Sequence, residues 1–228
     1  MYLITGGAGG LGLIFAKEIA ERVRSARLVL TGRSALDAEK QRQLEALGAQ
    51  VVYRQLDVAD GASVSGLLGW IAQEYGGLHG ILHSAGVIQD SFILNKTAAE
   101  VRAVLSPKVA GVVNLDEASR QHALDFLVLF GSGAGAMGSV GQADYAAANA
   151  FLDAYASYRN DLVAAGQRHG RTVSIAWPLW RSGGMKMEEA KERLLRGLGM
   201  TALESAAGIA ALYAALASGE ERVVVLAG

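Results

Sequence analysis

The 228-residue chain has no cysteine, only two prolines and 7% aromatic residues, and its 21 basic and 22 acidic residues nearly balance. Without cysteine, neither a disulfide framework nor a thiolate metal site can form. The net charge of -1 offers no basic surface for nucleic acid and no polybasic membrane patch. No apolar run approaches the ~18 residues of a membrane span, and the start does not resemble a secretory leader. These absences predict a cytoplasmic protein that binds neither nucleic acid nor membrane.

Glycine is abundant, with 29 residues, and apolar residues make up 51% of the chain. At this length the composition predicts one compact domain, 1–228, with a large buried sheet. Apolar strand-like runs alternate with amphipathic helical segments, and right-handed crossovers then predict an α/β, Rossmann-type doubly wound parallel sheet of about seven strands in the order 3-2-1-4-5-6-7. We expect strands at 2–5, 27–32, 51–55, 80–84, 126–130, 172–176 and 223–226. We expect helices after 12 and at 36–48, 60–75, 97–118, 143–165, 188–196 and 204–217.

A glycine-rich turn follows the first strand and leads straight into a helix. Such a turn lets backbone amides approach a pyrophosphate at the positive end of the helix. Glycines would also serve a tight left-handed turn or a close helix-strand contact, so this turn alone does not establish a nucleotide site. The candidate cofactor-binding residues of the turn are Thr5, Gly6, Gly7, Gly9, Gly10, Leu11 and Gly12.

The second strand ends at Arg33 and Ser34, where an NAD-binding fold usually places an acidic residue for the ribose. A guanidinium and a hydroxyl can both bond the oxygens of a 2′-phosphate, which favours NADPH over NADH. The alternative for Arg33 is a solvated surface side chain. Ligands bind beyond the carboxyl ends of parallel strands. The remaining cofactor-binding candidates are therefore the residues after the other strands: Asp57 and Val58 at the adenine, Ser84, Ala85 and Gly86 against the nucleotide, and Pro178 and Leu179 beside the nicotinamide.

Four residues supply the groups that reduction of a carbonyl needs. Ser132 lies thirteen residues before Tyr145, Lys108 lies twenty-four before Ser132, and Asn149 follows Tyr145 by one helical turn. A tyrosine with its unperturbed pKa of about 10 is a poor proton donor near neutrality, so we expect Lys108 to stabilise the phenolate and lower the pKa of Tyr145. Ser132 can hold the carbonyl oxygen, and the Asn149 amide can fix backbone or water in a proton relay.

These residues resemble the short-chain dehydrogenase/reductase superfamily and, within it, the ketoreductase domains of modular polyketide synthases, over essentially the whole chain. In ordinary members the lysine stands four residues after the tyrosine. Here Asn149 occupies that place and Lys108 comes earlier, which is similar to polyketide synthase and fatty acid synthase ketoreductases. The runs 31–34, 83–87, 145–150 and 177–180 are similar to other signatures of the family. Gly131 departs from the more common serine, but Ser132 keeps the catalytic register.

The resemblance implies NADPH-dependent reduction of a β-ketoacyl chain, carried on the phosphopantetheine arm of an acyl carrier protein, to a β-hydroxyacyl thioester. Asp90 is similar to the third residue of the Leu-Asp-Asp motif of B-type enzymes, which give the D-hydroxyl, although Ile88 and Gln89 replace its first two residues. Met137 stands where A-type enzymes have tryptophan. The family also has an N-terminal structural half, so we expect this chain to be the catalytic subdomain of a larger synthase with neighbouring domains.

Two other functions remain open, a free-standing short-chain reductase of a small ketone and a non-reducing degenerate ketoreductase that serves as scaffold or epimerase. Metal binding is not expected, because His79 and His83 on one strand lie roughly 13 Å apart. Trp177 and Trp180 fit either a substrate entrance or packing anchors. The charged run 186–193 fits a solvated helix or a lid hinged at 181–184. Asp144 is expected to cap a helix rather than act as a base.

Overall fold

The structure is a computed structural model that describes all residues except 49, 184–192, 194–196 and 198. One seven-stranded sheet runs through the molecule in the order β3-β2-β1-β4-β5-β6-β7, and every neighbouring pair is parallel. This confirms the predicted fold class and strand order. The strands are β1 (Tyr2–Thr5), β2 (Arg27–Gly32), β3 (Gln50–Gln55), β4 (Gly80–His83), β5 (Phe126–Ser132), β6 (Arg171–Trp177) and β7 (Arg222–Val224).

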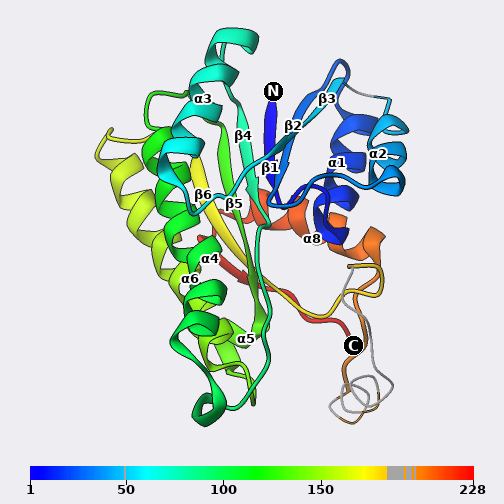
Figure 1. Cartoon of the computed structure of the whole chain (residues 1–228), viewed down its shortest axis with the longest axis vertical. Helices are drawn as coiled ribbons and strands as arrows, with labels where there is room; N and C mark the ends of the chain where they lie inside the picture. Colours follow the sequence, from blue (N-terminus) through cyan, green and yellow to red (C-terminus); the bar gives the residue numbers. More distant parts are fainter. Residues whose placement is uncertain (49, 184–192, 194–196, 198) are drawn as a thin grey trace.

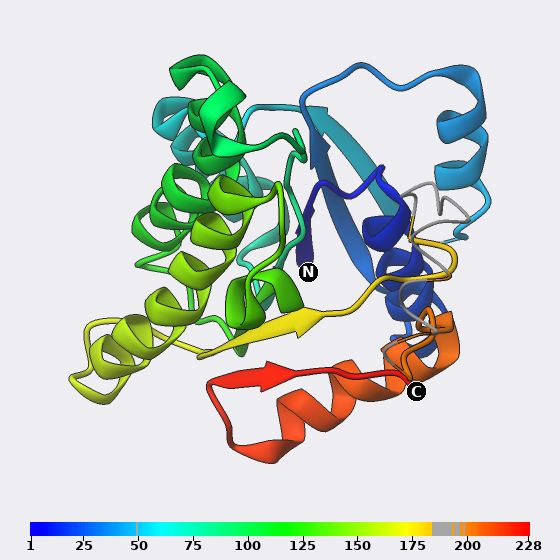
Figure 2. The same cartoon turned by 90° about the horizontal axis from the view of Figure 1, so that it is seen from below.

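Helices cover both faces of the sheet (Figures 1 and 2). One face carries α1 (Gly10–Arg22), α2 (Ala38–Glu45) and α8 (Ser205–Ser218), and the other carries α3 (Gly61–Tyr75), α4 (Ala98–Ala118) and α6 (Ala143–Ala164). Two short helices were not predicted, η1 (Ile93–Asn95) and α5 (Gly133–Met137). The helix predicted at 188–196 and the charged run 186–193 lie outside the described residues, apart from Arg193.

Side-chain caps explain why several predicted helix starts are one or two residues early. Asp37, Asp60 and Thr97 are the capping residues of α2, α3 and α4, and each accepts hydrogen bonds from amides of the first turn. Such residues precede the helix instead of belonging to it. In α4 the cap is reciprocal, because the Glu100 carboxylate also accepts from the backbone amide of Thr97 at 2.8 Å.

Two apolar clusters fill the space between the sheet and its two helix layers. Neighbouring residues of one strand alternate between them, so that Leu3 packs under α3 and α4 while Ile4 packs under α1. Trp177 and Trp180 are both buried in the second cluster, with ring centroids 5.1 Å apart and 5.9 and 5.6 Å from that of Phe15. This placement favours packing anchors over a substrate entrance.

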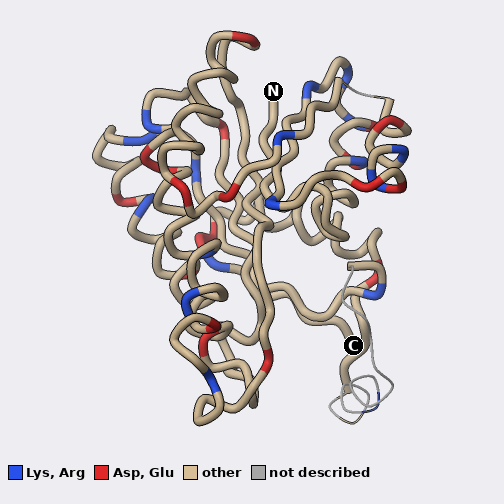
Figure 3. Tube along the Cα trace, in the orientation of Figure 1, with Lys and Arg blue, Asp and Glu red and all other residues tan. Residues whose placement is uncertain are grey.

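Basic and acidic residues are interspersed along the Cα trace, as Figure 3 shows. Within the described part of the chain, no helix combines the length and the apolar character needed to cross a membrane.

A buried ionic cluster joins α4, α6 and the start of β6. The carboxylate of Asp116 accepts from Arg159 Nε at 2.6 Å, from Arg168 Nε at 3.0 Å and from the Tyr155 hydroxyl at 2.9 Å. Arg159 also donates to the carbonyls of His169 and Gly170, so its buried guanidinium is well supplied with acceptors. Burial raises the pKa of Tyr155, and the Asp116 carboxylate adds to that rise.

Asp116→Ala removes the shared acceptor and leaves the buried Arg159 guanidinium without its counter-ion, whereas Arg168 keeps its ion pair with Glu117. We expect the free energy of unfolding to fall by about 3–5 kcal/mol, because an uncompensated buried charge is costly. Urea unfolding followed by circular dichroism measures this loss. The matched control is Glu21→Ala, which removes an exposed carboxylate paired with Lys17 at 3.8 Å and should cost less than about 1 kcal/mol. Similar losses in both variants would contradict the role assigned to the cluster.

Candidate active site

The four predicted catalytic residues come from three neighbouring elements. Tyr145 lies in the first turn of α6, and Asn149 lies one turn further on. Ser132 is the last residue of β5 and caps α5, where its Oγ accepts from the Ala134 amide at 3.3 Å. Lys108 is buried in the middle of α4, and its Nζ lies 6.0 Å from the centroid of the Tyr145 ring. The structure therefore brings all four residues together, although they are up to 41 positions apart in the sequence (149 − 108 = 41).

The electrostatics around Tyr145 differ from the expectation that Lys108 lowers its pKa. Burial raises the pKa of Tyr145, and hydrogen bonds from Ser132 and Asn149 oppose that rise. The Lys108 ammonium instead donates to the carbonyl of Phe130 at 2.7 Å. Tyr145 therefore keeps its proton at neutral pH, as a proton donor must. The negative charge of Asp90 adds to the rise in the pKa of Tyr145.

Asn149 has one amide atom in use and one without a partner. Its Nδ2 donates to the backbone carbonyl of Tyr145 at 2.7 Å, which agrees with the expectation that the amide fixes backbone. Its buried Oδ1 has no hydrogen-bond partner among the described residues. A buried acceptor of this kind is costly unless something bonds to it, so the atom is available to a water or a substrate group.

The glycine-rich turn has the geometry of a dinucleotide cradle. Gly6 has φ +65°, and a Cβ there would stand 3.0 Å from the backbone of Ser84 and Ala85. A Cβ on Gly12 would come 2.6 Å from the Gly6 carbonyl oxygen, so no larger residue fits. α1 begins at Gly10, and no side chain caps it. No side chain therefore accepts a hydrogen bond from the backbone amides of its first turn. These residues fit a bound pyrophosphate.

A buried histidine connects this turn to the lysine helix. His83 Nε2 is 3.0 Å from the Pro107 carbonyl, which can only accept, so this nitrogen carries the proton. Nδ1 then accepts from the Thr5 hydroxyl at 2.7 Å. Burial, with the Lys108 charge, lowers the pKa of His83 to about 3, so the ring is neutral. His79 is exposed and its Nδ1 lies 2.9 Å from the N-terminal amine, so both histidines have protein partners.

Side chains of β3 hold the backbone at Arg33 and Ser34. The Tyr53 hydroxyl donates to the Ser34 carbonyl at 2.6 Å, and the Gln55 amide donates to the Arg33 carbonyl at 2.8 Å. The Arg33 side chain itself is exposed and lines two adjoining hollows of about 80 and 330 Å³. Its position after β2 is therefore fixed, whereas its guanidinium can reach a ligand.

The other cofactor candidates divide into three groups. Asp57, Val58, Ala85 and Gly86 line the smaller hollow beside Arg33, although an oxygen of Asp57 already accepts from the Ala59 amide at 2.9 Å. Ser84 and Gly86 line the cavity that contains Tyr145. Pro178 and Leu179 line neither, and the Leu179 carbonyl accepts from the Leu203 amide at 2.8 Å. Contact of this pair with the cofactor stays a prediction. Both residues follow directly after β6, whose last residue, Trp177, pairs with Ser132.

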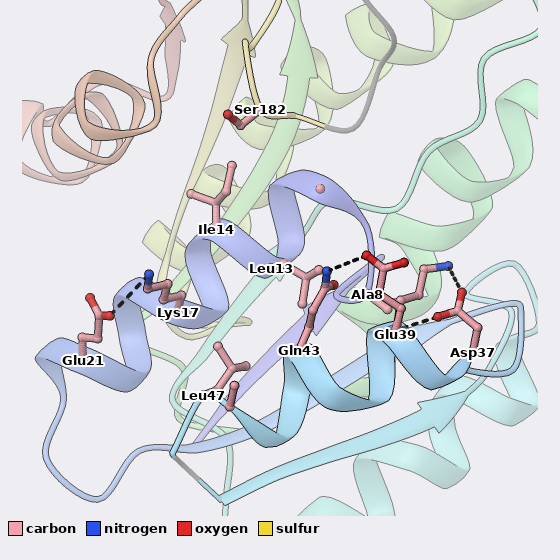
Figure 4. Close-up of a pocket in the computed structure, with 13 residues that line it drawn as sticks. Ala8, Leu13, Ile14, Lys17, Glu21, Asp37, Glu39, Gln43, Leu47 and Ser182 are labelled. Atoms are coloured by element: carbon pink, nitrogen blue, oxygen red, sulfur yellow. Dashed lines mark hydrogen bonds and ion pairs between the residues drawn. The ribbon is translucent and has the colours of Figure 1, made fainter.

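The cavity at Tyr145 has a volume of about 240 Å³. It contains the lysine, the tyrosine and the glycine-rich turn together, and its lining includes Gly6, Gly9, Gly10, Leu11, Gly12, Ile88, Lys108 and Tyr145. A larger hollow of about 690 Å³ lies between α1 and α2 (Figure 4). Charged pairs such as Lys17 with Glu21 line that hollow, and none of the four predicted catalytic residues does.

The predicted stereocontrol residues lie in two different segments. Asp90 Oδ1 accepts from the side chain of Gln142 at 2.9 Å, three residues before Tyr145. Met137 ends α5 and is exposed. Asp144 is not the cap of α6: Gln142 takes that position, and Asp144 instead forms an ion pair with Lys96 at 2.5 Å.

Sequence reasoning missed three residues beside the site, Lys96, Gln142 and Arg102. Lys96 and Gln142 connect the loop after β4 to the start of α6. Arg102 lies on α4 and lines the same 330 Å³ hollow as Arg33. The side-chain partners of Lys96 and Gln142 across the site, Asp144 and Asp90, lie 48 and 52 positions away, so spacing along the chain carried no signal for them.

Comparisons with known proteins give one family and many close structures. Residues 1–182 match the model of the KR domain. The chain is 52% identical to polyketide synthase PksL of Bacillus subtilis (strain 168) over 232 residues, which covers 100% of this chain but 5% of that protein. A ketoreductase domain from the bacillaene assembly line superposes with a TM-score of 0.97 at 49% identity, covering 99% of this chain and 55% of that one. A structure of A-type ketoreductases from a modular polyketide synthase reaches 0.87 at 34% identity, with 99% and 47% coverage.

The buried ammonium of Lys108 gives a pH-dependent stability that can be measured. Burial lowers the pKa of Lys108 from 10.5 to about 8. Between these values the unfolded chain holds a proton that the folded chain has released, so the stability rises with pH. We expect the unfolding free energy of the natural chain, relative to Lys108→Met, to rise by on the order of 3 kcal/mol from pH 7.5 to 10.5. Urea titrations at several pH values measure it.

The control for this series is Lys40→Met, which removes a partly exposed ammonium on α2. Its stability difference from the natural chain should stay flat over the same pH range. A flat difference for Lys108→Met as well would contradict the desolvation of the Lys108 ammonium.

Proposed function

This chain belongs to the KR domain family, and on that premise we propose that it reduces a β-ketoacyl thioester to a β-hydroxyacyl thioester with NADPH. The chain spans about one twentieth of the curated relatives it matches. We therefore propose that it works inside a larger synthase, beside an N-terminal structural half and other domains, on a chain carried by the phosphopantetheine arm of an acyl carrier protein.

The observation that carries this proposal is the assembly of a proton donor, its hydrogen-bond partners and a buried cation around one cavity. Tyr145 and Lys108 line this cavity together with the glycine-rich turn. Ser132 and Asn149 act on the same tyrosine hydroxyl. A carbonyl group placed there would lie within reach of an acid and beside the cradle that fits a dinucleotide.

The chain's own residues supply the acid half of the reaction. Tyr145, whose raised pKa keeps it protonated, donates its proton to the ketone oxygen as that oxygen gains negative charge. Ser132 hydrogen-bonds the same oxygen. Lys108 is buried and cationic below its pKa of about 8, and its Nζ lies 6.0 Å from the centroid of the Tyr145 ring. Its charge offsets part of the cost of the buried phenolate that forms, although burial still keeps the pKa of the free tyrosine raised. The unpartnered Oδ1 of Asn149 holds the group through which Tyr145 regains its proton.

We infer that the cofactor is held by the glycine-rich turn and by the residues after β2, β3 and β4. A bound reduced nicotinamide supplies the hydride. Gly6 and Gly12 admit the pyrophosphate, the hollow lined by Asp57 and Ala85 takes the adenosine, and Arg33 with Ser34 selects the 2′-phosphate.

We propose that the product carries the D-hydroxyl, as in B-type enzymes. The support is the position of Asp90, whose charge acts on Tyr145 and whose carboxylate is held by Gln142. Met137, which stands where A-type enzymes have tryptophan, supports the same outcome. Chiral chromatography of the hydroxyacyl product tests it, and the L-hydroxyl would overturn this part of the proposal alone.

A non-reducing scaffold is the second candidate function, and the intact site argues against it. A degenerate domain loses some of its catalytic residues or its cofactor-binding turn. Here the four predicted catalytic residues lie together, and the glycines of the turn keep their close contacts. The two functions differ in one assay, the consumption of NADPH in the presence of a β-ketoacyl thioester.

Tyr145→Phe removes only the proton donor. We expect turnover of a β-ketoacyl N-acetylcysteamine thioester to fall by about 10²–10⁴-fold, the usual contribution of a general acid, while the Kd for NADPH stays within about threefold. NADPH absorbance measures turnover and calorimetry measures binding. Tyr158→Phe, which removes an exposed hydroxyl from the same helix, is the control and should be fully active. Substantial turnover by Tyr145→Phe would contradict the assignment.

Arg33→Ala tests the choice of cofactor. If its guanidinium bonds the 2′-phosphate, the substitution should weaken NADPH by about 10-fold or more, since a charge-assisted hydrogen bond contributes about 1.5–3 kcal/mol, and should leave NADH nearly unchanged. Arg54→Ala, one strand away on β3, serves as the control. Equal losses for both cofactors would refute the role of Arg33 at the 2′-phosphate.

A further inference from the structure

Two segments that are distant in the sequence form one wall beside Tyr145. The first is the loop 87–96 after β4, and the second is the turn 138–142 between α5 and α6. The Ser91 amide donates to the Gly141 carbonyl at 2.9 Å, and the Gln142 side chain donates to Asp90 at 2.9 Å. Figure 1 shows the chain after β4 running to the end of the molecule where α5 lies.

A buried ion pair lies behind this wall. Lys96 Nζ is 2.5 Å from Asp144 Oδ2, and the two side chains are only 3% and 5% exposed. The same ammonium donates to the carbonyl of Gln89, next to Asp90. The second oxygen of Asp144 accepts from the backbone amide of Tyr145 at 2.9 Å. One cation therefore connects the backbone beside Asp90 to the backbone of the catalytic tyrosine.

The Lys96 backbone is itself anchored. It directly precedes Thr97, which caps α4 through the reciprocal bonds with Glu100. α4 also carries Lys108. The ion pair thus ties the helix with the buried lysine to the helix with the tyrosine, and the loop 87–96 lies between them.

Apolar burial does not hold the loop in place. Phe92, Ile93 and Leu94, at its tip, are 63%, 69% and 94% exposed. A segment with so little buried apolar surface has little intrinsic stability. The polar anchors at Gln89, Asp90 and Ser91 are what fix it.

Desolvating two charges is expensive, and an apolar pair of similar size would often stabilise a fold as well or better. The pair at Lys96 and Asp144 is therefore poorly explained by stability alone. Lys96 does not line the cavity at Tyr145, so it does not reach the reacting atoms.

We propose that Lys96 and Asp144 are positioning residues, which fix the loop carrying Asp90 against the first turn of α6, where Tyr145 lies, so that the ketone presents one face to the hydride. This inference rests on the proposed reduction of a ketoacyl thioester. Loss of the ion pair lets the loop shift. The proton donor Tyr145 is then misplaced relative to the substrate carbonyl, and the substrate can also bind in the opposite orientation.

The test uses Lys96→Met, Asp144→Asn and the double variant. Each single variant leaves one buried charge without its partner and should lower the melting temperature, whereas the double variant should regain most of that loss. A purely structural pair predicts that activity recovers with stability. The positioning role predicts that the double variant still has kcat lowered by about 10–100-fold, a mixed pair of alcohol products and an unchanged Kd for NADPH. Lys96→Arg, which keeps the charge, should restore part of the product selectivity.

The control is Lys17→Met, which breaks the exposed pair with Glu21 and should leave turnover and product ratio unchanged. A double variant with natural kcat and a single product would overturn the proposal. So would a loss of NADPH affinity parallel to the loss of kcat, since that indicates general damage to the site.

A readout without turnover separates this inference from the proposed function. Amide hydrogen exchange of residues 88–95 should be faster in the double variant than in the natural chain, and unchanged exchange would overturn the positioning role of the ion pair. If the natural chain consumes no NADPH with any β-ketoacyl thioester, the proposed function fails, while the exchange rates still decide whether the pair holds the loop.

Discussion

The hydrogen bonds of His83 connect the two halves of the site. Its ring spans from the Thr5 hydroxyl, at the end of β1, to the Pro107 carbonyl, next to Lys108. Because the ring is neutral, Nε2 donates to the Pro107 carbonyl and Nδ1 accepts from the Thr5 hydroxyl, and these two roles cannot be swapped. His83 therefore fixes the distance between the glycine-rich turn and the backbone next to Lys108, and this distance does not depend on a flexible loop.

The fold was readily predicted because a buried parallel sheet leaves plain signals. Its strands are short apolar runs between amphipathic helices, and the handedness of the crossovers then limits the order. The proposed catalytic residues could also be found, since Ser132 ends one strand and Tyr145 and Asn149 lie near the start of the next long helix. Boundaries failed where capping residues such as Thr97 were counted inside the helix. α5 was missed because five residues give no period to detect.

The sequence did not reveal which side chains become buried or which distant residues they contact. Lys108 was expected to act on the pKa of Tyr145, yet burial dominates that pKa, and the ammonium bonds the Phe130 carbonyl. Asp144 was expected to cap a helix, yet its partner Lys96 lies 48 residues away. Burial and long-range pairing arise only when the chain has folded, so patterns of neighbouring residues carry no record of them.

The place of β1 in the sheet has a consequence for biosynthesis. This strand comes first in the chain but lies between β2 and β4, with Tyr2 opposite Gly80. While the polypeptide emerges from the ribosome, one edge of β1 therefore stays unpaired until Gly80–His83 have been made, and the Gly6 turn lacks the Ser84 backbone against which it packs. Pairing of such distant segments is slow, because loop closure must precede the contacts that reward it. The apolar side chains of Leu3 and Ile4 are meanwhile open to chaperones, and to the same strand on another nascent chain.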